Sequence, residues 1–376
     1  MKRIACLCAD PGVPYGGTKG ASVHFGEMTR ALADEGSEVL ALAAHVAPDA
    51  SPSAGVVVEQ LPGPGKGSPA AERLEADATR TEWLVRRLRH HGAEMLYERL
   101  ALHTALGSLA ARDLGIPHVV EVNAPLLEES RRFRRLDEPE QAAVLEQATL
   151  RSADLVLAVS RPLAHYATQR GASRVRVMPN AVAAERFPAP SRDGGEEPVA
   201  VLAGNLRLWH GVETVAEAWR ILGPAAPALL VIGDGQGRDL LEAVGAEVTG
   251  PMPSSAVPAA MSRGQIGLAP YGADSPRYFS PLKLFEYLAA GLAVVAADLP
   301  GVTDIVGPES AMLVPAGDAG AFAQAVERLA SDESLRERMG AAGRELVTAR
   351  HTWRHRAREV LLAAAELPRP GAVTPA

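Results

Sequence analysis

Residues 279–301 read FSPLKLFEYLAAGLAVVAADLPG and contain one complete helix–turn–strand unit. Ser280 can cap a helix and Pro281 fits its first position. The apolar positions that follow recur at helical spacing: Leu282, Phe285, Leu288 and Ala289. Gly291 is a typical C-cap, and the apolar run Ala293–Ala297 behind it predicts a buried strand.

The same alternation of short apolar runs and amphipathic stretches covers the whole chain. We expect strands at Ile4–Ala9, Val39–Val46, Met95–Tyr97, His118–Val122, Leu155–Val159, Val175–Met178, Val199–Ala203, Ala228–Ile232, Ile266–Pro270, Ala293–Ala297 and Ala311–Val314. We expect helices at Ala21–Glu35, Glu72–His91, Ala101–Leu114, Pro162–Arg170, Val212–Leu222, Pro281–Ala290, Ala321–Ala330, Ser334–Thr348 and Thr352–Glu366. Most of the runs lack period-2 alternation, which is typical of parallel strands covered on both faces, so the fold class is α/β.

The strand–helix pattern restarts at Val199, after a polar stretch rich in glycine and proline at residues 193–198. This restart predicts two Rossmann-like, doubly wound parallel-sheet domains with a cleft between them. The expected parts are an N-terminal domain at 1–182, a linker at 183–198, a C-terminal domain at 199–350, a last helix at 351–366 that returns towards the N-terminal domain, and a flexible tail at 367–376.

Composition excludes several classes of protein. The 376 residues carry 38 Lys and Arg against 45 Asp and Glu, a net charge of −7, which disfavours a nucleic-acid partner. The only two cysteines, Cys6 and Cys8, cannot build a disulfide scaffold or a cysteine-ligated zinc site. No apolar run reaches the roughly 18 residues that a membrane span needs. We therefore expect a cytoplasmic protein.

A first candidate site is the glycine-rich loop at residues 10–20, between the first strand and the first helix. Backbone N–H groups near Gly16 and Gly17 can bind an anion at a helix N-terminus; a turn that merely needs positive φ is the alternative. The loop matches neither the P-loop nor the dinucleotide fingerprint, which disfavours a dehydrogenase.

A second candidate site lies in the quoted helix. Lys283 falls in its first turn, where a cation opposes the helix dipole unless an anion also binds there. Glu286, one turn further, can accept hydrogen bonds from vicinal hydroxyls, as acidic residues do with ribose. A phosphate and a ribose together describe a nucleotide; the alternative is an ordinary surface Lys and Glu.

These residues also carry a resemblance. Residues 278–291 and 294–301 closely resemble the nucleotide-sugar region of retaining glycosyltransferases of family 4 (glycosyl transferases group 1), which have the GT-B fold. Further segments of the chain match in order: Gly16–His24, Tyr97–Arg99, Glu121–Leu126, Val177–Val182 with Arg186-Phe187, Gly204–Glu213 and Ile232–Gly235. The resemblance covers about residues 1–365 and makes the N-terminal domain acceptor-binding and the C-terminal domain nucleotide-sugar-binding.

The resemblance implies three catalytic residues. Lys283, with the amide of Leu282, would hold the donor diphosphate, Arg207 would neutralise the same phosphates, and Glu286 would bind the ribose. Other donor contacts would come from the opening loop, from backbone near the sugar, and from a histidine where many relatives carry lysine: Gly16, Gly17, Phe279, Ser280, Pro281 and His210. Tyr278 takes the place of the second acid of the family's pair.

Three residues are candidates for binding the acceptor. His24 lies one turn into the first helix and could face the cleft, and Glu98 follows a strand, where it either touches the acceptor or orders the next loop. Asn123 falls where many relatives carry a histidine near the transferring carbon; it can hydrogen-bond a substrate but cannot act as a general base.

The implied activity is hexosyl transfer with retention from a nucleotide-diphosphate sugar, as co-substrate, to a small-molecule, lipid-linked or saccharide acceptor. No Asp-x-Asp cluster follows a strand, so we expect neither a metal nor another cofactor. Two other functions stay open: a catalytically weak nucleotide-sugar-binding partner subunit, and a sugar-nucleotide epimerase or hydrolase. The basic run Arg131–Arg135 is either a solvated helix face or a clamp for an anionic acceptor or membrane surface.

Overall fold

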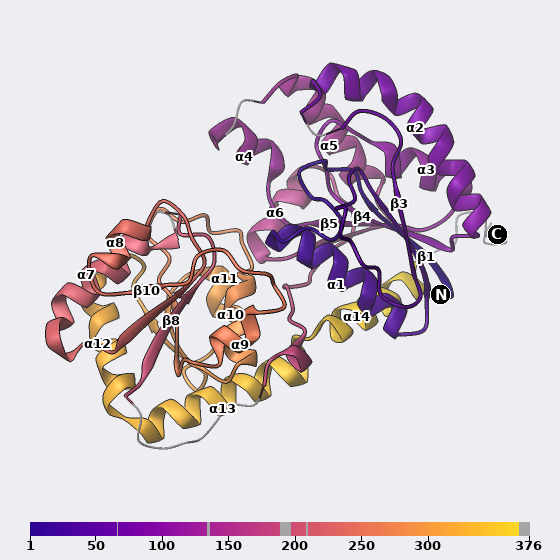
Figure 1. Ribbon diagram of the computed structural model, residues 1–376. Helices are drawn as coiled ribbons and strands as arrows, with labels where there is room; N and C mark the ends of the chain where they lie inside the picture. The colour runs from indigo at the N-terminus through magenta and orange to yellow at the C-terminus, as the bar shows by residue number, and fades with distance from the viewer. Residues whose placement is uncertain (66, 134–135, 189–196, 208–209, 368–376) are drawn as a thin grey trace. The chain divides into compact units, whose positions relative to one another are not determined.

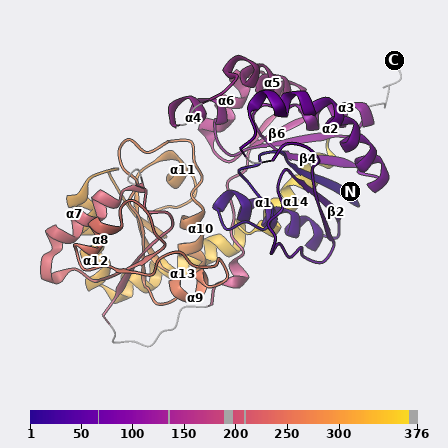
Figure 2. The same ribbon diagram turned by 45° about the horizontal axis from the view of Figure 1, so that its top comes forward.

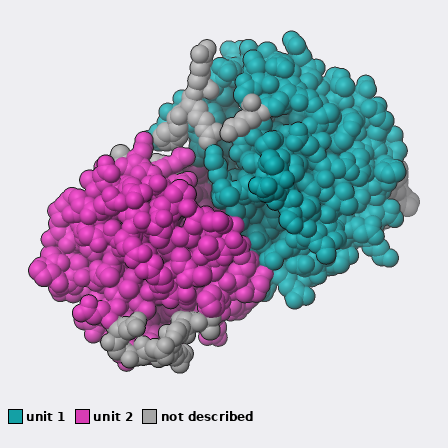
Figure 3. Space-filling view, in the orientation of Figure 1, with its two compact units in different colours: residues 1–179, 353–376 teal, residues 180–352 magenta. Residues whose placement is uncertain are grey.

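The computed structural model describes residues 1–65, 67–133, 136–188, 197–207 and 210–367. The chain divides into two compact units, Met1–Pro179 with Trp353–Ala376 (unit 1) and Asn180–Thr352 (unit 2), which Figure 3 colours separately. This division puts residues 183–188 of the expected linker inside unit 2. Residues 189–196 of that linker and residues 368–376 of the expected tail lie outside the described residues.

Unit 1 is built on a parallel sheet whose seven strands have the order β3-β2-β1-β4-β5-β6-β7. Its strands are β1 (Arg3–Cys8), β2 (Glu38–Ala43), β3 (Val56–Gln60), β4 (Met95–Arg99), β5 (His118–Val122), β6 (Leu155–Ala158) and β7 (Val175–Val177). The order reverses between β1 and β4. Ligands bind at the carboxyl ends of the strands beside such a switch point in doubly wound folds.

Helices cover both faces of this sheet (Figure 1). They are α1 (Gly20–Asp34), α2 (Ala70–His91), α3 (Leu106–Leu114), α4 (Leu126–Phe133), α5 (Pro139–Ser152), α6 (Arg161–Gln169) and α14 (Trp353–Ala365). Leu84 and Leu88 of α2 and Leu106 of α3 share a core with the strands. Helix α14 packs on α1, where Arg354 and Arg358 donate to the carboxylate of Glu35 over 2.6 and 2.8 Å.

Unit 2 repeats the plan with six parallel strands in the order β10-β9-β8-β11-β12-β13. The strands are β8 (Val199–Ala203), β9 (Ala228–Ile232), β10 (Glu247–Val248), β11 (Ile266–Ala269), β12 (Ala293–Ala297) and β13 (Ala311–Val314). Its switch point lies between β8 and β11, so the loops that follow these two strands are the expected ligand site.

Two cores hold the helices of unit 2 on opposite faces of the sheet, as Figures 1 and 2 show. The helices are α7 (Val212–Leu222), α8 (Arg238–Glu242), α9 (Val257–Met261), α10 (Leu282–Ala289), α11 (Pro300–Thr303), α12 (Ala319–Ser331) and α13 (Glu333–Arg350). Helices α7 and α12 pack through Val215 and Phe322 on one face, whereas Leu284 and Phe285 of α10 pack on the other.

The predicted fold class, two doubly wound α/β units with parallel sheets, is confirmed. Strands β3 and β10 were not predicted from the sequence. Strand β3 lies at the sheet edge, where only its first residue, Val56, is fully buried, and β10 has only two residues. In the basic run, Arg131 and Arg132 are exposed on α4, and Arg134 and Arg135 lie outside the described residues.

The predicted helix Pro281–Ala290 is one residue too long at each end, because α10 spans Leu282–Ala289. Pro281 is the N-cap and the helix begins at Leu282, so Ser280 does not cap it. Ser280 instead accepts a hydrogen bond from the backbone N–H of Asn180 over 3.0 Å, which occupies its hydroxyl. Gly291 follows the last turn with φ +74°, where its N–H bonds to the carbonyl of Leu288 and closes the helix.

Tyr287 fixes α10 to the end of β8, because its buried hydroxyl accepts a hydrogen bond from the N–H of Ala203 over 2.7 Å. Tyr287→Phe leaves that N–H unpaired in the core. We expect a loss of about 1–3 kcal/mol in the free energy of unfolding of unit 2, measured by urea titration. An unchanged unfolding midpoint would contradict this account of the helix's attachment.

Candidate functional site

The loops after β8 and β11 meet at the switch point of unit 2. Gly211 ends the first loop with φ +80°, and a Cβ placed there would stand 2.4 Å from the carbonyl oxygen of Pro270 in the second loop. Only glycine allows this approach. The loop that carries Arg207 and His210 is therefore held against the loop that leads into α10.

Lys283, His210 and Tyr271 form a cluster at this junction. The ammonium of Lys283 lies 5.3 Å from the ring centroid of Tyr271, and the ring of His210 meets the same ring edge-to-face at 6.4 Å. A Cβ at Gly204 would lie 3.8 Å from Nζ of Lys283, so this side chain reaches back to the end of β8. The fold thus brings together a lysine, a histidine and a glycine that lie up to 79 residues apart in the sequence.

Lys283 and Glu286 are both half-buried, and their ionisation is perturbed in opposite directions. Desolvation lowers the pKa of Lys283 to about 8, although the charge of Glu286 acts against this shift. Burial raises the pKa of Glu286 to about 7, against the charges of Arg186 and Lys283. Arg186 also donates to the carbonyl of Ser254 over 2.6 Å. Perturbed groups gathered at a switch point are typical of a ligand site.

Arg207 is exposed and carries a permanent charge. His210 bonds through Nδ1 to the carbonyl oxygen of Asn205. Burial, followed by the charges of Lys283 and Arg207, lowers the pKa of His210 to about 3. The imidazole is consequently neutral at pH 7 in the absence of ligand.

The segment at residues 279–281 is fixed from two sides. Asn180 donates its side-chain amide to the carbonyl of Ser280 over 2.6 Å, in addition to the backbone bond to the Ser280 hydroxyl. Phe279 packs on Tyr271 with ring centroids 4.6 Å apart. The first turn of α10 therefore has a defined position next to the Lys283 cluster.

In unit 1 the opening loop follows β1 at the switch point. Gly16 has φ +77°, and a Cβ there would collide with Ala50. Gly17 has no room for a side chain against Pro14 and Ser22, and its N–H donates to the carbonyl of Pro14 over 3.2 Å. A turn that needs positive φ accounts for Gly16, and close packing against Pro14 and Ser22 accounts for Gly17. The contact of either glycine with a donor phosphate stays a prediction.

His24 lies in a buried network and does not offer its ring to a cleft. It is 4% exposed, its Nε2 donates to Oε1 of Glu121 over 2.7 Å, and Trp353 covers its ring edge-to-face at 4.7 Å. Burial alone would raise the pKa of Glu121, but His24 and Arg99 hold it below its usual value. These contacts show that the ring supports β5 and anchors α14, and the expected acceptor contact of His24 stays a prediction that they do not support.

Glu98 is also misplaced by the sequence reasoning. It lies inside β4, is 1% exposed, and accepts a hydrogen bond from His118 over 2.7 Å. A Cβ at Gly107 would stand 2.1 Å from a Glu98 carboxylate oxygen, so α3 covers this side chain. These contacts support the alternative that Glu98 orders the chain that follows it, and its contact with an acceptor stays a prediction.

Asn123 follows β5 at the carboxyl end of the sheet. Both polar atoms of its side chain are shielded from solvent and have no hydrogen-bond partner among the described residues. A buried polar group without a protein partner is typically hydrogen-bonded to a ligand or a water molecule. Of the three acceptor candidates, Asn123 alone has both side-chain polar atoms buried and without a partner among the described residues.

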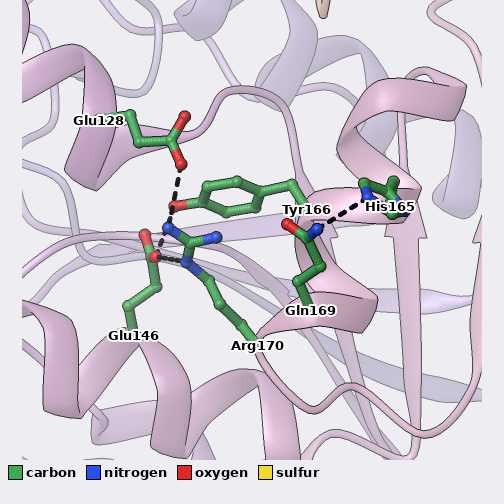
Figure 4. A network of polar contacts seen from close by, with 6 residues as sticks. All are labelled: Glu128, Glu146, His165, Tyr166, Gln169 and Arg170. Carbon is green, nitrogen blue, oxygen red and sulfur yellow. Dashed lines mark hydrogen bonds and ion pairs between the residues drawn. The ribbon is translucent and has the colours of Figure 1, made fainter.

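The helix after Asn123, α4, is anchored by the network in Figure 4. Arg170 donates to Glu128 of α4 over 3.2 Å and to Glu146 of α5 over 2.9 Å, and its guanidinium stacks 3.5 Å above the ring of Tyr166. Tyr166 donates to the same oxygen of Glu146 over 2.5 Å. The loop that carries Asn123 is therefore attached to both α5 and α6.

Within the described ranges, no three His, Cys, Asp or Glu side chains gather in a way that could hold a metal ion. None of the helices in this part of the chain has the length and apolar character required to cross a bilayer.

Comparison with known families matches both units. The profile described as "Glycosyltransferase Family 4" matches residues 18–186, and the profile described as "Glycosyl transferase-like" matches residues 212–362. The fold is similar to that of sucrose-phosphate synthase from Thermosynechococcus elongatus, with a TM-score of 0.74 and 20% identity over 97% of this chain and 99% of that one. HepE from Anabaena, solved in complex with UDP, gives a TM-score of 0.71 and 16% identity over 98% and 100%.

The chain is a group 1, family 4-like glycosyltransferase. Among curated proteins, this glycosyltransferase is 36% identical over 132 residues to the phosphatidyl-myo-inositol mannosyltransferase of Mycobacterium leprae, covering 33% of this chain and 34% of that protein. The glycosyltransferase spans about half or less of the length of the curated relatives it matches.

Two residues of the glycosyltransferase's candidate site were not predicted from the sequence. Tyr271 is the second residue after β11 and lies beneath both Lys283 and His210. An aromatic residue directly after a buried strand at a switch point was the available signal. Arg186 was quoted in the resemblance without a role, and its charge acts on Glu286 across a hundred residues of sequence, for which no local signal exists.

The raised pKa of Glu286 predicts a pH dependence of stability. The folded glycosyltransferase binds this proton more tightly than the unfolded chain, so Glu286 makes the protein less stable as pH rises from about 4.5 to about 7. Glu286→Gln lacks this titrating carboxyl. The difference in melting temperature between Glu286→Gln and the wild type should therefore change in favour of the variant as pH rises through this range. Parallel melting-temperature profiles of the two proteins would contradict the burial assigned to Glu286.

Proposed function

We propose that this glycosyltransferase moves a sugar from a nucleoside-diphosphate sugar to an acceptor hydroxyl, with retention of anomeric configuration and without a metal ion. The observation that carries the proposal is the cationic cluster at the switch point of unit 2, with Lys283 in the first turn of α10 and Arg207 in the facing loop. HepE, which has a similar fold, was solved with UDP bound, and this supports UDP as the first nucleotide to test.

The donor diphosphate would bind Lys283, Arg207 and the N-terminus of α10. A lysine in a first turn opposes the helix dipole, and its partial burial disfavours its charge. A diphosphate relieves both effects, since it is attracted by the ammonium and by the N–H groups at the helix start. Glu286, one turn along α10, would accept hydrogen bonds from the ribose hydroxyls.

The chemical step breaks the bond between the anomeric carbon and the diphosphate oxygen and forms a bond from that carbon to the acceptor oxygen on the same face. The acceptor's proton passes to the departing phosphate oxygen, so no protein carboxylate needs to act as nucleophile or base. The transition state has oxocarbenium character, and negative charge grows on the leaving diphosphate. Fixed positive charges at that position stabilise it directly.

The acceptor would contact unit 1 through Asn123, whose unsatisfied amide can both donate to and accept from a hydroxyl. An amide fits the proposed step, because it orients an acceptor without competing for its proton. Small-molecule, lipid-linked and saccharide acceptors all present such a hydroxyl.

Lys283→Ala and Arg207→Ala test the donor assignment. Each removes one charge that stabilises the leaving diphosphate, and loss of such a group typically lowers the turnover rate about 10²–10³-fold. We expect at least a tenfold loss of turnover in each variant, with unchanged melting temperature, measured as nucleoside diphosphate released from a sugar nucleotide in the presence of acceptor.

The matched control is Arg220→Ala, which removes an exposed arginine from the far end of α7, where it pairs with Glu217. Its rate should equal that of the wild type. Wild-type rates in Lys283→Ala and Arg207→Ala would reject the donor site, and nucleotide release that does not depend on acceptor would point to a hydrolase.

A further inference from the structure

The imidazole of His210 is held in one tautomer by the main chain. Its Nδ1 lies 2.5 Å from the carbonyl oxygen of Asn205. A carbonyl can only accept a hydrogen bond, so Nδ1 carries the hydrogen. In the neutral ring the other nitrogen, Nε2, is then unprotonated and can only accept.

The loop around His210 keeps the ring in this orientation. The N–H of Gly204 bonds to the carbonyl of Ile232 over 2.8 Å, and the N–H of Leu206 bonds to that of Asp234 over 3.0 Å. The N–H of His210 itself bonds to the carbonyl of Arg207 over 2.9 Å. Turning the ring over would break the hydrogen bond from Nδ1 to the Asn205 carbonyl, which also accepts from the N–H of Arg207 over 2.8 Å.

The charges that face His210 all favour the neutral ring while no anion is bound. Lys283 approaches from α10, Arg207 belongs to the same loop, and the apolar face of Tyr271 packs from the loop after β11. Glu286 is the nearest described carboxylate that acts on Lys283, and it is itself largely protonated below pH 7. Nε2 of the neutral ring is therefore a hydrogen-bond acceptor on which the positive charges of Lys283 and Arg207 act.

A bound diphosphate would replace the positive electrostatic environment of His210 with a negative one. Its oxygens are acceptors only, so they repel the lone pair of a neutral Nε2 but bind an Nε2–H strongly. Two or more negative charges at the position of Lys283 and Arg207 also stabilise an imidazolium. A lysine at position 210 would be charged before and after binding, whereas His210 would be charged only after it.

We propose that His210 is a proton-coupled clamp, which takes up one proton from solvent when the donor diphosphate binds and returns it when the nucleoside diphosphate leaves. The proposal rests on the proposed function and adds to it the number of protons taken up per nucleotide bound, which is one. Uptake of one proton means that affinity falls tenfold for each unit of pH increase. A residue at position 210 that does not titrate lacks this contribution.

The test is isothermal titration calorimetry at pH 7 in two buffers of different ionisation enthalpy, which reports protons taken up per ligand bound. The probe is UDP, followed by GDP, ADP and dTDP if UDP does not bind. Wild type is compared with His210→Gln and His210→Lys. Lys283, Glu286 and the nucleotide itself also titrate near this pH. His210→Gln keeps these groups and adds no charge, so the difference between the wild type and this variant isolates the proton of His210.

We expect the wild type to take up close to one proton more per nucleotide than either variant, and its affinity relative to His210→Lys to fall about tenfold from pH 7 to pH 8. Equal proton numbers in proteins that all bind nucleotide would overturn the clamp and leave the donor site standing. Failure of the wild type to bind any of the four nucleotides would instead overturn the proposed function.

A second measurement needs no variant. With ¹⁵N-labelled histidine, the Nε2 resonance of His210 should move from the unprotonated to the protonated range when nucleotide is added at pH 7. A resonance that stays unprotonated at saturation would overturn the clamp even if a variant failed to fold.

Discussion

The half-buried ammonium of Lys283 is the charge on which the candidate site of unit 2 depends. Desolvation opposes it, the dipole of α10 opposes it, and it depresses the ionisation of its neighbour His210. Its one described carboxylate neighbour, Glu286, has its own pKa raised to about 7. This excess of positive charge is the feature on which the proposed function rests, because a bound diphosphate would supply the opposite charge.

The position of Lys283 is set by the strand order of unit 2 and by a few backbone and side-chain contacts. The strand order puts the ends of β8 and β11 side by side, Gly211 lets their loops meet at the Pro270 carbonyl, and Tyr287 fastens α10 to Ala203. Asn180 then holds the residue before the helix through two hydrogen bonds. Each of these contacts is a backbone or buried side-chain constraint, so the site rests on the rigid part of unit 2.

The sequence predicted most strands of both sheets, because strands such as Val199–Ala203 and Ala293–Ala297 are continuous apolar runs that only a sheet covered on both faces requires. It also indicated the glycine end of α10 and the importance of Lys283. It could not predict that Ser280 accepts a hydrogen bond from Asn180, a hundred residues away, or that Trp353 packs on the ring of His24. These partners come from distant segments, and a local capping or facing argument does not contain them.

His24 and Glu98 have in common that each side chain has a buried partner. The sequence suggested an acceptor contact for His24 on the first helix and for Glu98 at the end of a strand, yet Glu121 and His118 satisfy these side chains inside the protein. Asn123 differs because its amide remains unsatisfied. The distinction between a structural and a ligand-binding polar residue therefore depends on the partner, which the sequence of one element does not reveal.

The most direct measurement is a crystal structure of the protein with UDP, or with whichever nucleoside diphosphate binds most tightly. The account predicts diphosphate oxygens at hydrogen-bond distance, about 3 Å, from Nζ of Lys283 and from the Arg207 guanidinium, with the ribose hydroxyls on Glu286. A nucleotide bound at another place, with Lys283 and Arg207 free of phosphate, would contradict it.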